Sequence, residues 1–122
     1  MASSALKDQP DGSVARVIHR AREQAGLSSQ DVANLVGVGL RQVQNWSAGK
    51  GRPADRRRLK TLLDLQYVLD LLSDIYDPES ALIWLHARNR LLGGERPLDL
   101  LSTPEGADEV IKLLDRLADG NF

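Results

Sequence analysis

The sequence contains no cysteine, few aromatic residues and no long apolar run. Its 122 residues include two tryptophans, two tyrosines and one phenylalanine. The absence of cysteine excludes disulfides, thiolate metal sites and a cysteine nucleophile. No apolar run approaches the roughly 20 residues of a membrane-spanning helix, and residues 1–12 lack the apolar core of a signal peptide. We therefore expect a protein of the cytoplasm that does not contact a membrane.

Residue patterns for catalysis and metal binding are also missing. His19 and His86 are the only histidines, and neither has a metal-ligand spacing. The carboxylates are spread along the chain without a pairing typical of general acid–base catalysis. No glycine-rich phosphate loop follows a predicted strand. We therefore expect no enzymatic activity, no cofactor and no metal.

The charge is divided unequally between the two halves of the chain. Residues 1–60 contain 11 Lys and Arg against 5 Asp and Glu, whereas residues 61–122 contain 5 against 12. The resulting net charges of +6 and −7 give the overall charge of −1. This asymmetry suggests different partners for the two halves, with a polyanion for the basic half. Two solvated faces of one protein are the alternative explanation.

Leu, Ala, Val and Ile supply most of the apolar residues, which favours helices packed by aliphatic side chains. No alternating strand pattern of useful length is present, so we expect an all-α fold in one domain or in two small domains that share a core. After a loose tail over 1–12, glycine, proline and capping residues predict helices over about 13–25, 28–36, 40–46, 55–76 and 78–87, short turns around 93–97, and a final helix after Thr103.

Three capping signals support these helix boundaries. Ser13 is expected to cap the first helix, and Ser28 with Asp31 resembles a capping box. Thr103 followed by proline predicts the start of the last helix, and Gly120 its end. The long helix over 55–76 has apolar residues over more than one stripe, which is typical of a helix buried between two layers or in a dimer interface.

Residues 28–46 have the spacing of a helix-turn-helix. Ala33 is small where two helices would cross, and Gly37 four residues later permits a positive φ in the turn. Five larger apolar residues occupy positions that must be buried, namely Val32, Val36, Val38, Val43 and Trp46. The stretch Asn45-Trp46-Ser47-Ala48-Gly49 resembles the Xre/Cro-repressor class, in which Trp-x-x-Gly closes the recognition helix. Gly39 departs from that class, where Ser or Thr usually caps the recognition helix.

This resemblance implies DNA binding over a domain of residues 13–54. Arg can bridge the acceptors of guanine, and Gln or Asn the donor and acceptor of adenine, whereas helix starts and cations contact phosphates. The predicted DNA-binding residues are Ser29, Gln30, Arg41, Gln42, Gln44, Asn45, Lys50 and Arg52, with further backbone contacts from Arg56, Arg57 and Arg58. A charged helix start is also often merely solvated, and such modules can keep their fold without binding DNA.

A second pattern lies in the rear half. Trp84-Leu85 is followed by Asn89, Leu92, Gly94, Pro97 and Leu100-Leu101 before the last helix. The pattern resembles the toxin-binding domain of Xre/MbcA/ParS-type antitoxins: Trp-Leu, Asn-x-x-Leu, Gly, and Pro-x-x-Leu-Leu. The resemblance spans residues 60–122, and we expect the long helix and this domain to occupy 55–122. Asn89 and Pro97 would start helical turns, Gly94 would permit a turn, and Trp84 and the leucines would be core.

The resemblance also implies a function. In the resembled family the C-terminal end of the antitoxin blocks the active site of a RES-domain toxin that degrades NAD. It therefore implies a type II antitoxin that neutralises a cognate RES-type toxin and represses its own operon by binding operator DNA. The implied toxin-binding residues are Arg116, Asp119, Gly120, Asn121 and Phe122; a frayed end is the alternative.

We expect a homodimer, because one helix-turn-helix contacts a single half-site and a dimer contacts two. Two other functions stay open. The chain could be an Xre-class repressor whose rear half only dimerises or senses a ligand. It could also be an adaptor that binds a protein partner and has lost its contact with DNA.

Overall fold

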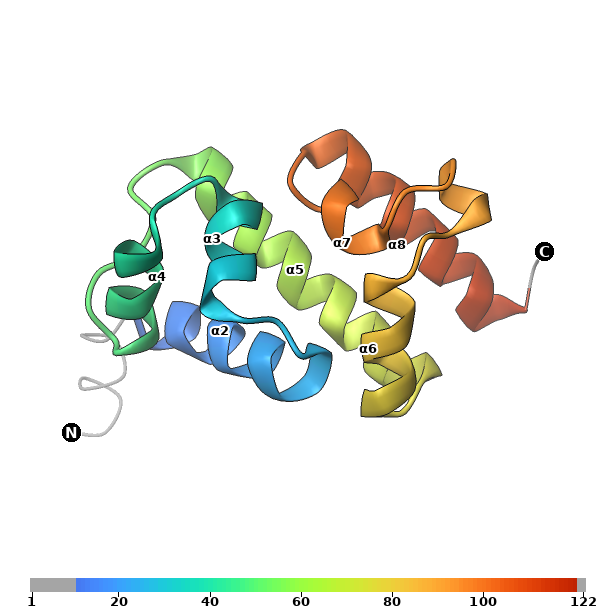
Figure 1. The fold of residues 1–122 in the computed structure, drawn as a ribbon, viewed down its shortest axis with the longest axis horizontal. Helices are drawn as coiled ribbons and strands as arrows, with labels where there is room; N and C mark the ends of the chain where they lie inside the picture. The colour runs from blue at the N-terminus through green and yellow to red at the C-terminus, as the bar shows by residue number, and fades with distance from the viewer. Residues whose placement is uncertain (1–10, 121–122) are drawn as a thin grey trace.

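The computed structural model describes residues 11–120, and the elements within this range are helical. Apart from an isolated bridge between Asn89 and Glu95, these residues contain no β-structure. None of the helices in this range is both long and apolar enough for a membrane span. The prediction of an all-α fold is confirmed (Figure 1). The elements, labelled as in Figure 1, are α2 (Asp11–Ala25), α3 (Ser29–Val36), α4 (Leu40–Ser47), α5 (Arg56–Ile75), α6 (Pro78–His86), the 3-10 turn η1 (Arg90–Leu92), α7 (Pro97–Leu100) and α8 (Pro104–Asp119).

Local side-chain contacts define most helix starts. The Asp31 amide donates to Ser28 Oγ at 3.0 Å, and the Ser28 amide donates to Asp31 Oδ2 at 2.9 Å, so the predicted capping box is present. Thr103 Oγ1 likewise accepts from the Gly106 amide at 3.0 Å and caps α8. Gly37 ends α3 with a φ of 83°, a left-handed conformation that favours glycine.

The start of the first described helix differs from the sequence-based expectation. We expected Ser13 to precede the helix and residues 11 and 12 to belong to the tail, but α2 begins at Asp11, which places Ser13 in its first turn. A helix boundary can move by one or two residues because the terminal turn has few intrahelical hydrogen bonds to lose. Residues 1–10 of the predicted tail lie outside the described residues.

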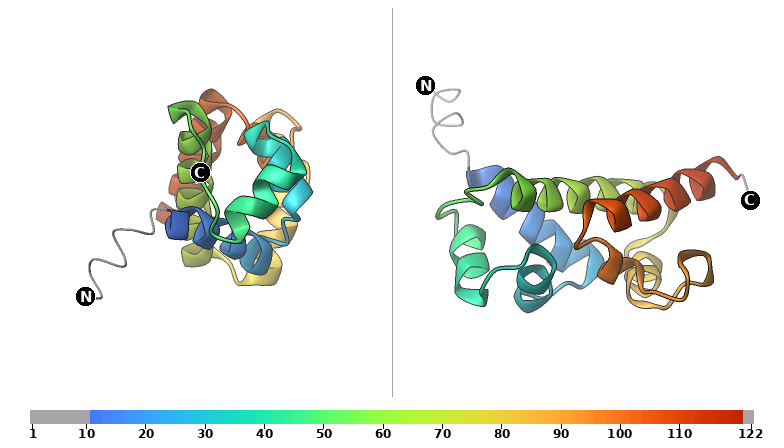
Figure 2. Two further views of the ribbon diagram at one scale, coloured as in Figure 1. Left: turned by 90° about the vertical axis from the view of Figure 1, so that its left-hand side faces the viewer. Right: turned by 90° about the horizontal axis from the view of Figure 1, so that it is seen from above.

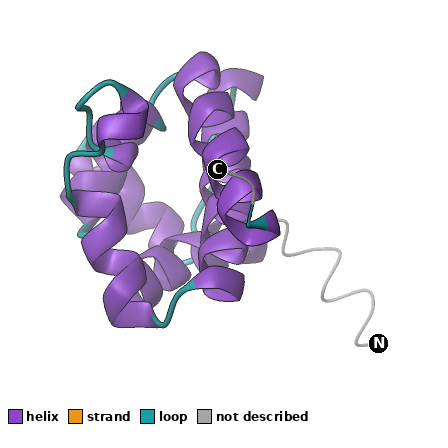
Figure 3. Ribbon diagram, turned by 90° about the vertical axis from the view of Figure 1, so that its right-hand side faces the viewer, coloured by secondary structure: helices purple, strands orange, loops and turns teal. Residues whose placement is uncertain are grey.

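The helices form two groups joined by α2. Helices α5 and α8 pack side by side, and α3, α4, α6 and α7 lie on the other side of the molecule (Figures 2 and 3). Helix α2 contacts α4, α5 and α6, so it links the first half of the chain to the second. Helix α4 and the C-terminal end of α8 lie at opposite ends of the molecule (Figure 1).

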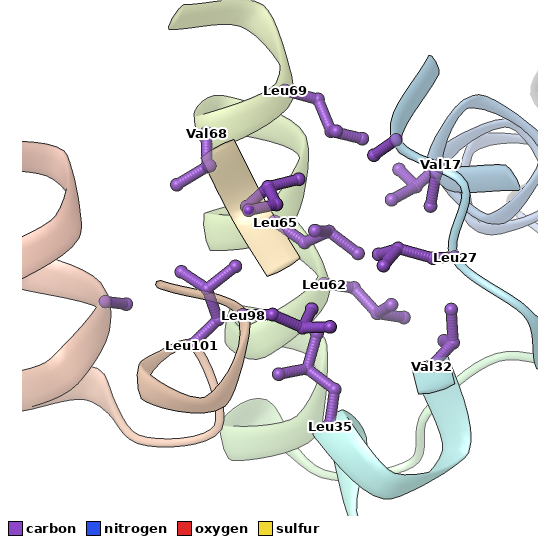
Figure 4. Packing of buried hydrophobic residues seen from close by; sticks show 14 of the residues in the cluster. Val17, Leu27, Val32, Leu35, Leu62, Leu65, Val68, Leu69, Leu98 and Leu101 are labelled. Atoms are coloured by element: carbon purple, nitrogen blue, oxygen red, sulfur yellow. The ribbon is translucent and has the colours of Figure 1, made fainter. Parts of the chain in front are cut away.

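One hydrophobic core runs through both halves. Figure 4 shows Leu35 of α3 and Leu98 of α7 pointing toward the same region beside Leu62 of α5. The buried side of α5 comprises Thr61, Leu62, Leu65, Val68, Leu69 and Leu72. Helix α5 packs against α2 and α8 on this side only, so the expectation that it is buried between two layers is wrong. Leu63 and Tyr67 remain exposed on its other side.

Several residues predicted as core are only partly buried. Val38, Trp84 and the motif leucine Leu100 pack against the core without being enclosed by it. Trp84 lies beside Ile83 and Tyr76 in a shallow hollow of about 320 Å³. A tryptophan is large enough that one edge commonly stays in contact with solvent even when most of it is packed.

Gly106 permits the closest approach between two elements of the rear half. A Cβ atom at this position would overlap the carbonyl oxygen of Leu100, at the end of α7. Because the obstacle is backbone, it cannot move aside as a side chain would. Gly106 therefore sets the distance between α7 and α8, a role that the sequence pattern did not indicate.

Two candidate binding surfaces

Helix α4 presents a polar face built on two buried anchors. Val43 is 0 % exposed and Trp46 is 1 % exposed, and they hold the helix against α2 and α3. With 3.6 residues per turn, Arg41 and Asn45 lie one turn apart on the side opposite these anchors. Gln42 and Gln44 flank them, and all four side chains are exposed. The structure therefore brings the four predicted base-contacting residues onto one face.

One basic residue that the sequence analysis missed, Arg22 of α2, lies beside the start of α3. Arg22 Nη2 donates to Ser29 Oγ at 2.9 Å, because the left-handed turn at Gly26 (φ 63°) returns the chain beside the end of α2. Ser29 is half-buried, and Gln30 is exposed with its Nε2 donating to Asn34 Oδ1 at 2.9 Å. A phosphate at this helix start would therefore meet a guanidinium as well as the predicted Ser29 and Gln30. The arginine could have been found only by placing α2 against α3.

The connector after α4 carries exposed cations, and the first turn of α5 carries an engaged one. Lys50 and Arg52 are exposed, as their predicted phosphate contacts require. Arg58 is engaged within the chain instead: its Nη1 lies 2.6 Å from Asp55 Oδ2, and its Nη2 donates to the Gly37 carbonyl oxygen at 3.4 Å. Asp55 also accepts from the Arg58 amide as the cap of α5, which lowers the pKa of its carboxyl. Arg58 thus ties the start of α5 to the α3–α4 turn.

The second surface lies at the end of α8. Gly120 caps the helix with a φ of 72°, as predicted, and Arg116 and Asp119 are exposed beside it. Asn121 and Phe122, the other two predicted toxin-binding residues, lie outside the described residues. The structure thus brings Arg116, Asp119 and Gly120 together at one exposed helix end.

A hollow of about 440 Å³ lies between η1 and α8, one turn before this helix end. Its lining combines apolar side chains with both signs of charge, and consists of Leu91, Leu92, Gly93, Glu109, Lys112, Leu113 and Arg116. Leu91 is 66 % exposed, the highest value among the large apolar side chains of residues 11–120. The predicted Arg116 therefore borders an apolar surface that the sequence analysis did not identify.

The motif residues explain why Leu91 is exposed. Asn89 Oδ1 accepts from the Leu91 amide at 2.9 Å and caps η1, and the amide of Gly94 donates to the Asn89 carbonyl oxygen at 2.9 Å. In the short turn fixed by these bonds, Leu92 is buried and its neighbour Leu91 faces outward. The predicted roles of Asn89 as cap, Gly94 as turn (φ 83°) and Pro97 as start of α7 are confirmed. These motif residues thus fix the backbone of the turn that exposes Leu91.

Metal binding is not indicated by the described part of either surface. Over residues 11–120, no three His, Asp or Glu side chains are grouped so as to hold a metal ion. What both surfaces offer is a combination of exposed polar, charged and apolar groups, the chemistry of macromolecular recognition.

Similarity to known proteins agrees with this arrangement. Residues 76–120 match the family "Antitoxin Xre/MbcA/ParS C-terminal toxin-binding domain". The chain is 33 % identical over 109 residues to the mycobacterial cidal antitoxin MbcA of Mycobacterium tuberculosis, which covers 89 % of this chain and 95 % of the relative. It is 41 % identical over 97 residues to a probable mycobacterial cidal antitoxin of the same organism, with 80 % and 81 % covered.

A solved structure shows the same fold. The crystal structure of the M. tuberculosis MbcT–MbcA toxin–antitoxin complex contains a chain that matches with a TM-score of 0.74 and 32 % identity, covering 89 % of this chain and 96 % of that one. The family match over residues 76–120 includes η1 and α8. The chain belongs to the Xre/MbcA/ParS family of antitoxins.

Proposed function

We propose that this antitoxin neutralises a cognate RES-type toxin through its C-terminal surface, formed by the hollow beside Leu91 and the end of α8. The observation that carries the proposal is the similarity over 89 % of the chain to an antitoxin whose solved structure is a complex with its toxin. The exposed leucine beside a guanidinium supports it, because apolar anchors with arginine at their edge are typical of protein interfaces.

We propose further that the end of α8 blocks access to the active site of an NAD-degrading toxin. Helix α8 ends at one extremity of the molecule, and Gly120 terminates it with a left-handed residue (Figure 1). Arg116 and Asp119 border this end and could pair with polar groups of an active site that accepts a charged dinucleotide. Steric exclusion of NAD by the residues from Arg116 onward is the mechanism this geometry favours.

We also propose that the α3–α4 unit binds operator DNA and represses the operon of the antitoxin. The exposed Arg41, Gln42, Gln44 and Asn45 support this part of the proposal, as does the basic connector at Lys50 and Arg52. Helix α4 lies at the end of the molecule opposite to the end of α8 (Figure 1). Separate surfaces would allow toxin and DNA to be bound at the same time.

Co-expression with the toxin tests the first two proposals. We expect the wild-type chain to co-purify with the toxin, to restore growth and to preserve cellular NAD. Leu91→Ser and Arg116→Ala should each weaken the complex, and removal of residues 120–122 should impair neutralisation while the fold is retained. The control is Leu63→Ser, which replaces another exposed leucine, on α5 (54 % exposed, against 66 % for Leu91). It should leave the binding of the toxin unchanged.

The outcomes separate the parts of the proposal. If no complex forms with the toxin encoded next to this gene, the antitoxin function is wrong for this pair, and a repressor whose rear half serves another purpose is the better explanation. If a stable complex forms but still degrades NAD, toxin binding stands and active-site blockage is wrong.

A further inference from the structure

The outward face of α5 carries an ordered pattern of charge. The buried residues of α5 occupy one side of the helix. Residues that follow one another at spacings of three and four share a helix face, and one such series lies on the side opposite the buried residues. In chain order, this outward face consists of Arg56, Lys60, Leu63, Tyr67, Asp70 and Asp74. The face is therefore basic at its start, apolar in the middle and acidic at its end.

These side chains are accessible in the isolated chain. Leu63 is 54 % exposed and Tyr67 is 48 % exposed, which is unusual for two large apolar residues one turn apart on the same helix. Lys60 forms an ion pair with Asp64 at 2.9 Å, and Asp70 forms one with Arg20 at 2.7 Å, but the side chains of Lys60 and Asp70 remain more than half exposed. Within residues 11–120, neither Arg56 nor Asp74 takes part in an ion pair.

We propose that this face of α5 binds the same face of a second copy of the chain, with the two helices antiparallel. An antiparallel pair centred on residue 65 places position 56 opposite 74, position 60 opposite 70, and position 63 opposite 67. Every charged position then faces the opposite charge, and Leu63 packs against the aromatic ring of Tyr67 from the other copy. A parallel pair would place bases against bases and acids against acids.

The symmetry of the charge pattern on this face of α5 identifies a second copy of the chain as its partner. An isologous dimer requires one surface that is complementary to itself, so that each contact occurs twice around the two-fold axis. A basic–apolar–acidic sequence on a single helix meets this requirement only in the antiparallel arrangement. An unrelated partner would not require the two halves of the face to mirror each other in charge.

The size of the face predicts a modest affinity. Helix α5 has 20 residues and is therefore about 30 Å long, and a single helix pair of this length buries less than a standard-sized interface. We expect a dimer that dissociates on dilution into the micromolar range. The interface contains none of the residues assigned above to the toxin, and Arg56 is its one residue that was also predicted to contact the DNA backbone. Self-association of the chain without toxin or DNA therefore tests this proposal independently of the proposed function.

Charge reversal at the two ends of the face tests the pairing register. Arg56→Asp and Asp74→Arg each turn both terminal attractions into repulsions, and each should weaken self-association about tenfold or more. An acid at the first turn of α5 and a base at its last turn agree with the helix dipole, so both variants should fold. Sedimentation velocity over a concentration series measures the association.

The decisive measurement is whether combining the two charge reversals restores dimerisation. The double variant Arg56→Asp/Asp74→Arg should dimerise like the wild type, and a mixture of the two single variants should form a heterodimer although each alone is largely monomeric. Leu63→Asp should also abolish dimerisation, whereas Leu91→Asp, which replaces the most exposed leucine elsewhere, should not. A wild-type chain that stays monomeric at 100-fold above micromolar concentration (about 0.1 mM) would overturn the proposal. So would a dimer that neither charge reversal affects, or whose loss the double variant does not restore.

Discussion

The Nε2 atom of His86 lies 3.2 Å from the carbonyl oxygen of Ala25, 61 residues earlier in the chain. A carbonyl oxygen can only accept, so the ring nitrogen must carry the proton and donate to the last turn of α2. The carbonyl groups at a helix end have no partner within the helix. A side chain of the proposed toxin-binding half thus completes a helix of the basic half, and the exposed Leu82 packs against Gly26 at the same junction.

Replacement of His86 by Ala should weaken the junction between the halves. We expect a loss of about 1–2 kcal/mol in the free energy of unfolding, because a part-buried carbonyl loses its hydrogen-bond donor. His19→Ala is the matched control. His19 bonds the Ser47 carbonyl oxygen at 2.9 Å but is exposed, so water can replace it. Urea unfolding followed by circular dichroism measures both; equal losses would show that the junction contributes nothing beyond an ordinary surface contact.

Gly106→Ala should be more destabilising than a substitution at a glycine with left-handed backbone. A Cβ at residue 106 overlaps a backbone oxygen, so α8 must move away from α7, and we expect a cost of about 3 kcal/mol. Gly93→Ala has open space around its Cβ and a φ of 69°, so only backbone strain of about 1 kcal/mol is expected. Thermal and urea unfolding of both variants provide the comparison. The reverse order would mean that α8 can shift freely on α7.

Acid should destabilise the fold through three depressed carboxyl pKa values. The backbone amides of Arg58 and Ser80 lower the pKa of Asp55 and Asp77, and the Arg96 side chain lowers that of Asp99. Each pKa is lower in the folded than in the unfolded chain, so the stabilisation is fully present above the unfolded value, near pH 4, and is lost as the pH falls through the lower folded values.

Urea midpoints measured between pH 7 and pH 3 should therefore stay constant to about pH 5 and then decline. Asp77→Asn keeps a capping side chain on α6 but removes its charge, so its midpoint should decline less steeply than that of the wild type. A variant that follows the wild-type curve would show that the Asp77 carboxyl does not contribute to the acid sensitivity.

Substitutions on α4 and on the connector should affect DNA binding in different ways. Arg41→Ala or Asn45→Ala should weaken binding to the promoter fragment by about 1–3 kcal/mol and relax the sequence preference. Arg52→Ala should weaken binding to all sequences alike and reduce the salt slope by about one. Arg90→Ala, an exposed arginine of η1, is the control. Mobility shifts at several salt concentrations distinguish these effects, and α4 variants that behave like Arg90→Ala would exclude this face from DNA recognition.

Some site residues were predictable from the sequence and others were not. Arg41, Gln42, Gln44 and Asn45 follow from the helical period once Val43 and Trp46 are assigned to the core. Arg22 could not be assigned to the start of α3, because its contact with Ser29 depends on the path of the chain through Gly26. The apolar content of α5 likewise could not show which of its leucines would be left exposed.

Leu91 and Leu92 show the same limit between two adjacent residues. Both are apolar and both stand in the motif, yet one is exposed and the other is buried. A 3-10 turn of three residues offers too few positions for a periodic pattern that would separate an inner from an outer side. Their roles depend on where α8 lies.

The sequence by itself determined the helix caps and helix ends. The capping box of Ser28 and Asp31, the Thr103 cap and the stop at Gly37 depend on residues at most four positions apart, so their physical cause lies within a short segment. The tertiary structure alone decided the His86–Ala25 bond, the closeness of α7 and α8 at Gly106, and the exposure of Leu63 and Leu91. These features arise from contacts between distant segments, and the apolar pattern of one helix does not specify which of its neighbours will cover it.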